Sequence, residues 1–522
     1  MHISAKQLRL VSLMLVLYYV IIAWVFQRNG FEHTERLFFT QKLKMLFEYD
    51  ENTLITLGTT FPTIPFLINI VFAPFGYLFA PIAASIVATS LLFYYMVYDA
   101  AKSALPVRTM YISILALFML HPQFIYIAVS GRNVAVLLFC FYMLFRLLFL
   151  YYETQVTFYL SLASLALGCV IFSEINFLWL VLSFMPFIVL VSLEGIKVSK
   201  DEPPAYQYFQ ALNNRSLRRK LVNRTISIYF VLFLLPMSAY YMFRSLNQVH
   251  AGNPNYFLLS QYSNWRVTGL INIKDVLESG SGENMHRQLQ IVFQLFTVFL
   301  APIFLSAMFL FKGKLYKLLT ILTPLLLITI LLIDLKVYLT VEYYMIIPVI
   351  AIVSLNFTSA DRYRKPIAHI TLLLGTILTI WGGFYYFKET SDFEEQLFTK
   401  ILMEPKEWLG PKVETEYQEL AGYLQNMASP DAPVLIDDAI AYSIVAHLPS
   451  LQGLVMPMQR NYITVVENPA LAAQYVCIAK RINRLHNFSS LNAYTVDMMK
   501  IKTGFTPTRV FETKNWIIYS IR

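Results

Sequence analysis

Long apolar segments separated by short polar stretches fill the chain up to about residue 388, where the pattern stops. Each segment is close to the roughly 20 residues that a helix needs to cross the ~30 Å hydrocarbon core of a bilayer. Eleven such segments are expected to form transmembrane helices: 8–26, 79–99, 107–127, 133–151, 156–175, 176–194, 225–244, 290–311, 316–334, 341–357 and 367–387. The pattern predicts a polytopic α-helical membrane protein whose transmembrane domain covers residues 1–388.

Residues 389–522 have the mixed polar and apolar pattern of a water-soluble domain. The stretch "EYQELAGYLQNM" has the period of an amphipathic helix, and "AIAYSIVAHL" also favours a helix. The stretches "APVLIDD", "YVCIAK" and "RVFETKNWIIYSI" favour strands. Alternation of strand and helix predicts a small soluble α/β domain after the last membrane span.

Two long connections, 27–78 and 245–289, are predicted on the side of the membrane where the first span ends. The first has helical periodicity and mixed charge, so it is expected to lie flat on the membrane as an amphipathic helix. Its apolar part, 54–75, contains three prolines, which disfavour one straight helix. This part is predicted to be interfacial or only partly inserted; if it crosses the membrane, the count becomes twelve.

The basic residues give the orientation, because lysine and arginine concentrate in cytoplasmic loops. The marking residues are Lys6, Arg9, Lys102, Arg108, Lys197, Lys200, Arg215, Arg218, Arg219, Lys220, Arg224, Lys312, Lys314, Lys317, Arg362, Arg364 and Lys365. They place the N-terminus in the cytoplasm, and eleven spans then place residues 389–522 outside it. A twelfth span would move that domain inside. A bacterial inner membrane is expected, although an endoplasmic reticulum protein would have the same pattern.

Composition removes several function classes. The chain is 57% hydrophobic and 14% charged, and its net charge of +9 fits cytoplasmic loops and anionic lipid without any nucleic-acid partner. The three cysteines have neither a disulfide framework nor zinc-ligand spacing. No phosphate-binding loop, dinucleotide turn or hydrolase serine motif occurs, which argues against a nucleotide-driven pump. No cofactor is required by the sequence, and nothing in it demands a divalent metal.

Glu32 and Glu35 follow the first span and are the candidate catalytic residues. A helix would place them on one face, where a carboxylate can act as a general base toward an acceptor hydroxyl or orient an acceptor amine. The alternative is an ordinary solvated helix face.

Other charged residues lie at the ends of spans on the same predicted side. The cations Arg132, Arg244 and Lys336 are candidates for binding the phosphate of a lipid-linked donor. The acids Glu174 and Glu342 are candidates for lining a cavity, since charges this close to apolar spans favour a partner or a cavity. Snorkelling to the interface is the alternative for the cations. It explains Glu174 poorly, because an acid has little reach.

Asp437 and Asp438 are a pair of acids directly after a predicted strand. Such a pair can bind a metal or a sugar. It can also cap the helix that is expected to begin near Ala439, and capping is the interpretation we favour.

The layout resembles the GT-C superfamily of integral membrane glycosyltransferases, in particular bacterial relatives of the protein mannosyltransferases and of the lipid A aminoarabinose transferase. The resemblance lies in the acids after the first span, in the proline-containing "TFPTIPFLINIVFAPFG", and in the stretches "LHPQFIYIAVSGRNVAVLLFCFYMLFRLL" and "YLSLASLALGCVIFSEINFLWLV". The C-terminal extracytoplasmic α/β domain also fits many members. The resemblance is diffuse but covers most of the chain.

The resemblance implies an inverting transfer of a sugar from a polyprenyl-phosphate donor to a glycan, lipid or protein acceptor on the extracytoplasmic face. Glu32 or Glu35 would be the carboxylate near the acceptor, and the cations would bind the donor phosphate. The alternatives are a transporter or flippase of a lipid-linked saccharide, a polymerase or ligase of surface polysaccharide, and a structural membrane subunit. Against transport, only one proline-interrupted segment is present, without a counterpart in the second half.

Overall fold

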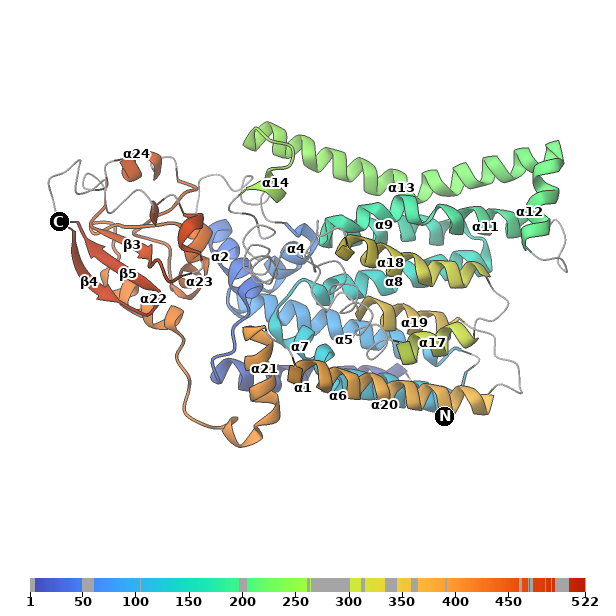
Figure 1. Cartoon of the computed structure of the whole chain (residues 1–522), viewed down its shortest axis with the longest axis horizontal. Helices are drawn as coiled ribbons and strands as arrows, with labels where there is room; N and C mark the ends of the chain where they lie inside the picture. Colours follow the sequence, from blue (N-terminus) through green and yellow to red (C-terminus); the bar gives the residue numbers. More distant parts are fainter. Residues whose placement is uncertain are drawn as a thin grey trace.

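The computed structural model describes most of the chain. The described residues are 5–48, 61–103, 105–196, 204–260, 263, 301–310, 315–333, 345–357, 365–389, 392–459, 462–467, 469, 473–483, 485–489, 491–492 and 507–521. They form a long array of helices with a smaller α/β part at one end (Figure 1). The predicted fold class, a polytopic helical protein with a C-terminal α/β domain, is confirmed.

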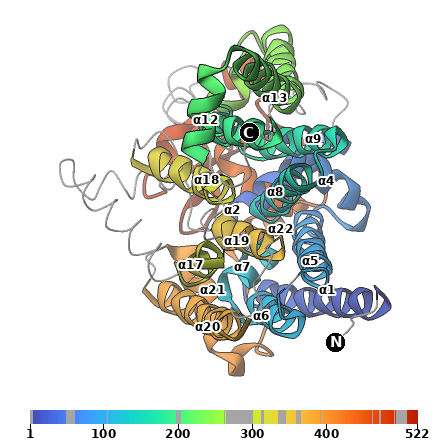
Figure 2. The same cartoon turned by 90° about the vertical axis from the view of Figure 1, so that its right-hand side faces the viewer.

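The helical part extends from α1 to α20, and its helices run side by side along the long axis of the molecule (Figure 1). Seen along that axis in Figure 2, α8 and α19 lie inside the array, whereas α1, α13 and α20 lie at its edge. The bounds are α1 Ala5–Arg28, α5 Ala80–Ala100, α6 Val107–Leu120, α7 Pro122–Ser130, α8 Val134–Thr154, α9 Thr157–Ser173, α10 Leu180–Ser183, α11 Met185–Ile196, α12 Pro204–Asn213, α13 Arg215–Ala251, α14 Tyr256–Leu259, α17 Ala301–Leu310, α18 Leu315–Ile333, α19 Ile346–Asn356 and α20 Lys365–Glu389.

Each of the eleven apolar segments contains helix in its described residues. Within the described part, five helices are long and apolar enough to cross a membrane, or seven if two bent pairs each form one span. One pair is α6 with α7, bent by 59°; the other joins Ile175–Ser183 to α11, bent by 45°. The first bend falls at His121 and Pro122. The proline disfavours the helical conformation for the residue before it, and His121 is extended. Two of the predicted spans are therefore broken, and the count of eleven stays a prediction.

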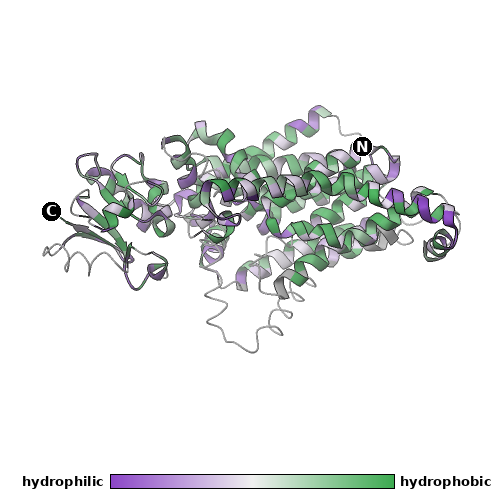
Figure 3. Cartoon of the chain, turned by 90° about the horizontal axis from the view of Figure 1, so that it is seen from above, coloured by the Kyte–Doolittle hydropathy of each residue, from purple (hydrophilic) through white to green (hydrophobic). Residues whose placement is uncertain are grey.

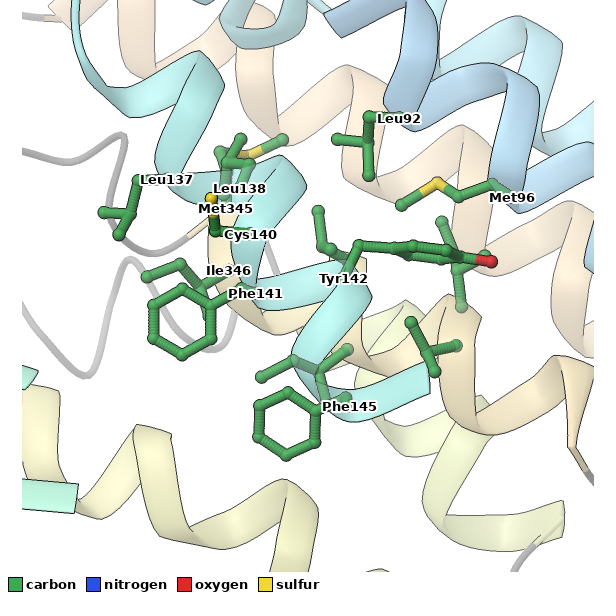
Figure 4. Packing of buried hydrophobic residues seen from close by; sticks show 14 of the residues in the cluster. Leu92, Met96, Leu137, Leu138, Cys140, Phe141, Tyr142, Phe145, Met345 and Ile346 are labelled. Atoms are coloured by element: carbon green, nitrogen blue, oxygen red, sulfur yellow. The ribbon is translucent and has the colours of Figure 1, made fainter. Parts of the chain in front are cut away.

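Helix α8 shows how the array is held together. Fifteen of the 21 residues of α8 are buried, as expected for a predominantly apolar helix inside an array. Figure 4 shows Phe141 and Phe145 of this helix near Ile346 of α19, and Leu92 of α5 on the opposite side. Close packing of this kind, with no aqueous face, fixes α8 as the centre of the helical part.

The first long connection is not a helix lying on the membrane surface. It contains α2, Thr34–Glu48, in which every residue from Glu35 to Met45 is buried. The prediction of a surface-lying amphipathic helix is wrong because α2 is covered on both sides, by α5 of the helical part and by α23, Asp438–His447, of the C-terminal part. The local pattern of α2 could not indicate that residues distant in the sequence pack against it.

The proline-containing segment forms α4, Thr63–Phe72, and a short 3-10 turn, Ala73–Phe75. A helix of ten residues rises about 15 Å, roughly half the thickness of the hydrocarbon core. The helix α4 alone is therefore too short to cross the membrane. Residues 54–60 lie outside the described residues, so the interfacial or partly inserted placement of 54–75 stays a prediction. Most of the second long connection, 261–300, lies outside the described residues.

The C-terminal α/β part contains a five-stranded sheet in the order β2-β1-β3-β5-β4. The strands β2, β1 and β3 are parallel, and β5 and β4 are antiparallel. Helices α22 and α23 pack on one face and α24 on the other. The bounds are α21 Phe393–Met403, α22 Glu416–Met427, β1 Val434–Ile436, α23 Asp438–His447, β2 Leu454–Val455, α24 Tyr462–Glu467, β3 Tyr475–Ala479, β4 Thr508–Glu512 and β5 Trp516–Ser520.

Buried polar contacts join α2 to both ends of α23. At the start of α23, Asp438 accepts a hydrogen bond from Gln41 Nε2 at 2.7 Å and lies 3.6 Å from Lys42 Nζ. At the end of α23, Lys44 Nζ donates to the carbonyl oxygens of Val445, at 3.4 Å, and Leu448. A cation at a helix C-terminus and a paired acid at its N-terminus both complement the helix dipole. These contacts hold the α/β part against α2.

Candidate active site

Glu35 and Arg132 are brought together although 97 positions separate them in the sequence. Glu35 lies in the first turn of α2, and Arg132 lies in the turn between α7 and α8. Arg132 Nε donates to Glu35 Oε2 at 3.3 Å, and the two residues are only 9% and 5% exposed. A solvated surface helix does not explain Glu35, because a buried carboxylate needs a partner such as this one.

Glu32 precedes α2 and faces the α/β part. Its oxygens accept hydrogen bonds from Gln418 Nε2 at 2.9 Å and from Thr415 Oγ1 at 3.2 Å, and His447 Nε2 lies 3.0 Å away. Arg36 Nη2, one turn along the chain, lies at 3.6 Å. Burial raises the pKa of Glu32, but His447, Arg36 and Gln418 outweigh it and keep the pKa below the ordinary value. This acid therefore stays ionised at neutral pH.

The expectation that Glu32 and Glu35 share one helix face is wrong. The helix begins only at Thr34, so Glu32 lies in the extended segment before it. Glu35 consequently faces the helical part while Glu32 faces the α/β part. The two candidate carboxylates occupy different surroundings.

Arg36 belongs to the site and was not identified from the sequence. It is buried, and its Nε has no hydrogen-bond partner among the described residues. Gly131, which adopts φ 74°, lies against it: a Cβ there would come 3.0 Å from Arg36 Cγ. The turn that carries Arg132 thus needs glycine to lie against Arg36. One sequence signal could have pointed to Arg36: it lies four residues after Glu32, a spacing at which opposite charges often pair.

His33 and Glu394 form a second connection, between the start of α2 and the start of α21. His33 Nε2 lies 3.0 Å from Glu394 Oε2, and His33 Nδ1 accepts from the Glu35 backbone N–H at 3.1 Å. Thr34 N donates to Glu394 at 2.9 Å. Burial raises the pKa of Glu394, but His33 and Thr34 outweigh it and lower the pKa to about 2. These contacts fix the backbone that carries Glu32 and Glu35.

Glu174 is connected to the turn of Arg132 by a contact between the residues next to them, Ser173 and Asn133. It is buried between α9 and the 3-10 helix Ile175–Trp179, where its Oε1 accepts from Asn176 Nδ2 at 2.5 Å. Asn133, which follows Arg132, donates to the carbonyl of Ser173 at 3.4 Å. Glu174 therefore caps a short helix beside the turn of the site.

Arg244 lies on α13, at the edge of the helical array (Figure 1). Its guanidinium is 5.7 Å from the ring of Tyr240, and no described contact joins it to Glu32 or Glu35. Its Nε is buried and has no hydrogen-bond partner among the described residues. Lys336 and Glu342 lie outside the described residues.

Asp437 caps α23, as predicted. Its Oδ1 accepts from the backbone N–H of Ala439 at 3.0 Å, and Ser489 Oγ donates to its other oxygen. Within the described part of the chain, no group of three or more His, Cys, Asp or Glu side chains could hold a metal ion.

Replacing Asp437 with alanine should cost about 0.5–2 kcal/mol of stability, because the cap is lost. Asparagine should cost less, because its side chain can still cap.

Burial, followed by the charge of Asp438, raises the pKa of Asp437 to about 6 from 3.8. The stability linked to this proton is present below about pH 4 and is lost as the pH rises through about 6. The Asn variant should lack that pH dependence in thermal unfolding between pH 4 and 7; an unchanged profile would contradict this assignment.

No family model and no curated protein matches this sequence. Solved structures do match. The structure of ArnT from Cupriavidus metallidurans bound to undecaprenyl phosphate is 11% identical, with 99% of each chain covered and a TM-score of 0.50. ArnT from the same organism in the apo state gives 11% identity, coverage of 97% of this chain and 98% of that one, and a TM-score of 0.46. The apo oligosaccharyltransferase from Archaeoglobus fulgidus is 11% identical, with 98% of this chain and 74% of that chain covered, and its TM-score is 0.41.

The helical array, the buried acids after the first helix and the C-terminal α/β part make up a fold that this chain has in common with ArnT. The likeness to ArnT from Cupriavidus metallidurans extends over 99% of each chain. At 11% identity this similarity shows that the two chains have the same fold.

Proposed function

We propose that this chain is a glycosyltransferase that moves a sugar from a polyprenyl-phosphate donor to an acceptor on the extracytoplasmic face of a membrane. The observation that carries the proposal is the buried Glu35–Arg132 pair, where the helical array meets the α/β part. The lipid-phosphate donor is supported by the fold, since the ArnT of like fold is bound to undecaprenyl phosphate.

In the proposed reaction the acceptor oxygen or nitrogen attacks the anomeric carbon of the donor sugar. The bond from that carbon to the phosphate oxygen breaks, and the lipid phosphate leaves with the electron pair. Attack opposite to the leaving group inverts the anomeric centre. The proton of the acceptor passes to a carboxylate, for which we propose Glu35, with Glu32 as the second candidate.

Arg132 has two successive partners in this proposal. Arg132 neutralises Glu35, with Nε 3.3 Å from Oε2. When the donor phosphate arrives, the guanidinium moves its contact to the phosphate, since charge-assisted contacts to phosphate are strong. Glu35, no longer in contact with Arg132, then accepts the proton of the acceptor. Arg36, whose Nε has no hydrogen-bond partner among the described residues, lies beside the same turn as a further cation for the phosphate. Arg244 and Lys336 remain proposed phosphate-binding residues, and Glu174 and Glu342 remain proposed cavity residues.

Replacing Arg132 with glutamine should weaken binding of undecaprenyl phosphate by about 10- to 150-fold, the value of one hydrogen bond to a charged group. Arg244→Ala should show a loss of the same order if Arg244 binds the phosphate. The measurement is a titration of undecaprenyl phosphate into purified full-length protein, followed by native mass spectrometry. Lys412→Gln, an exposed residue of the connection before α22, is the matched control.

A structure of the full chain with added undecaprenyl phosphate tests the proposal most directly. A phosphate between Glu35 and the guanidinium groups of Arg132 and Arg36 is the expected result. A cavity that crosses the membrane, with lipid translocation and no sugar transfer, would favour the flippase alternative. Transfer assays with and without a chelator of divalent ions would show whether a metal takes part.

A further inference from the structure

A second charged surface lies at the end of the molecule opposite the α/β part. It consists of α12 and the first turns of α13 (Figure 1), and we call it the basic end. Residues 204–224 contain five basic residues and no acidic ones. Figure 3 shows this end as hydrophilic, whereas the helices that lead away from it are hydrophobic. The site proposed above does not use any of these residues.

The basic residues of α13 are followed along the helix by an exposed apolar stripe. Arg215, Arg218 and Arg219 are exposed and, by their spacing, lie on one face of the helix. The exposed apolar residues Val222 and Ile226 continue on that same face, and Ile226 is 60% exposed. Charge therefore gives way to apolar surface within about one helical turn. That is the profile of a helix that passes from lipid headgroups into hydrocarbon.

Arg224 has a different role. It lies on the opposite face of α13 and is partly buried. Its guanidinium donates to the carbonyl of Gly195, at 3.4 Å, and to the side chain of Gln155. This arginine holds α13 against the ends of α8 and α11. It leaves the other three arginines facing outward.

Helix α12 adds exposed aromatic residues beside this charge. Tyr206, Tyr208 and Phe209 are exposed, and Phe209 is 63% exposed. Among the described side chains of this helix, only Ala211 is buried, in a small cluster with Leu193 and Leu221. Large aromatic rings next to arginines are unfavourable in open water but fit the headgroup layer, where rings and charges are both satisfied.

We propose that the basic end binds the anionic headgroups of the adjacent leaflet, with α12 lying in the interface. Three outward arginines supply the charge complementarity, and the aromatic residues of α12 supply the apolar contact. The occupant is a lipid surface, because the stripe of α13 runs without a break from these arginines into apolar surface. The proposal requires only that the chain spans a membrane, and it is independent of the proposed transfer reaction.

The test is hydrogen–deuterium exchange on the full chain in nanodiscs of pure phosphatidylcholine and in nanodiscs that also contain phosphatidylglycerol. Phosphatidylglycerol should slow amide exchange in α12 by at least about fivefold, the contribution of one basic residue at an anionic surface. Replacing Arg215, Arg218 and Arg219 with glutamine should abolish this difference. Replacing them with lysine should retain it, because charge rather than forked geometry is what attracts the surface.

The matched control replaces Arg481, Lys412 and Lys514, three exposed basic residues at the other end of the molecule, with glutamine. This control should keep the effect of phosphatidylglycerol on α12. If the control loses the effect of phosphatidylglycerol to the same extent, the effect depends on the net charge of the protein, and the proposal is overturned. Exchange in wild-type α12 that does not depend on phosphatidylglycerol would overturn it as well. Thermal unfolding of each variant shows that it is folded.

Discussion

Replacing Glu35 with glutamine should abolish sugar transfer while the protein stays folded. Glutamine has nearly the same shape, and its amide oxygen can still accept the hydrogen bond that Arg132 donates at 3.3 Å. It cannot take a proton from the acceptor, so a loss of about 10²- to 10⁴-fold in rate is expected, the usual contribution of a general base. The measurement is the single-turnover rate of sugar transfer to acceptor in nanodiscs, with thermal unfolding as the check on folding.

Glu32→Gln is the informative companion to this variant. Glu32 contacts Gln418, Thr415 and His447 of the α/β part, so its substitution should lower the melting temperature more than Glu35→Gln does. If Glu32→Gln alone stops transfer in a folded protein, Glu32 is the base. Full activity in both variants would remove a carboxylate base from the proposed mechanism.

Replacing Lys42 with methionine should destabilise the contact between α2 and α23 by about 3–5 kcal/mol, the usual effect of breaking a buried ion pair. Lys42 and Asp438 are both 2% exposed, and Asp438 Oδ1 has no hydrogen-bond partner among the described residues. Gln41 would be the remaining described polar partner of the carboxylate. We expect faster proteolytic release of the α/β part and a lower melting temperature.

The double variant Lys42→Met with Asp438→Leu is the control for this prediction. Removing both charges together should recover much of the lost stability, because the cost arises mainly from the carboxylate left alone. Lys406→Met, which changes an exposed lysine in the same way, should leave the free energy of unfolding within about 0.5 kcal/mol of the wild-type value. A Lys42→Met protein as stable as the Lys406→Met protein would show that the pair contributes little.

Hydrophobic pattern was sufficient to predict the helical segments and the α/β character of the end of the chain, since both follow from local periodicity. It was not sufficient for α2, whose charged residues suggested an aqueous face. Its partners include Glu394 and Asp438, which lie about 360 to 400 positions along the chain. No local pattern carries that information.

The candidate site shows the same division. Glu35 and Arg132 were both selected from their positions at the ends of apolar segments, which a local reading can find. Their pairing was not predicted, and neither were Arg36, His33 and His447, because each depends on how distant segments meet. Arg244 was chosen by the same local rule, yet no described contact links it to Glu32 or Glu35.

The dependence of α2 on α23 also sets an order for biosynthesis. A ribosome makes α2 among the first 48 residues, but the partners of Lys42 and Lys44 are added only when residues 438–448 emerge. Through the synthesis of the intervening spans, the contacts of these lysines with α23 cannot form. The segment after the first helix therefore acquires its final packing last, when the end of the chain folds back onto its beginning.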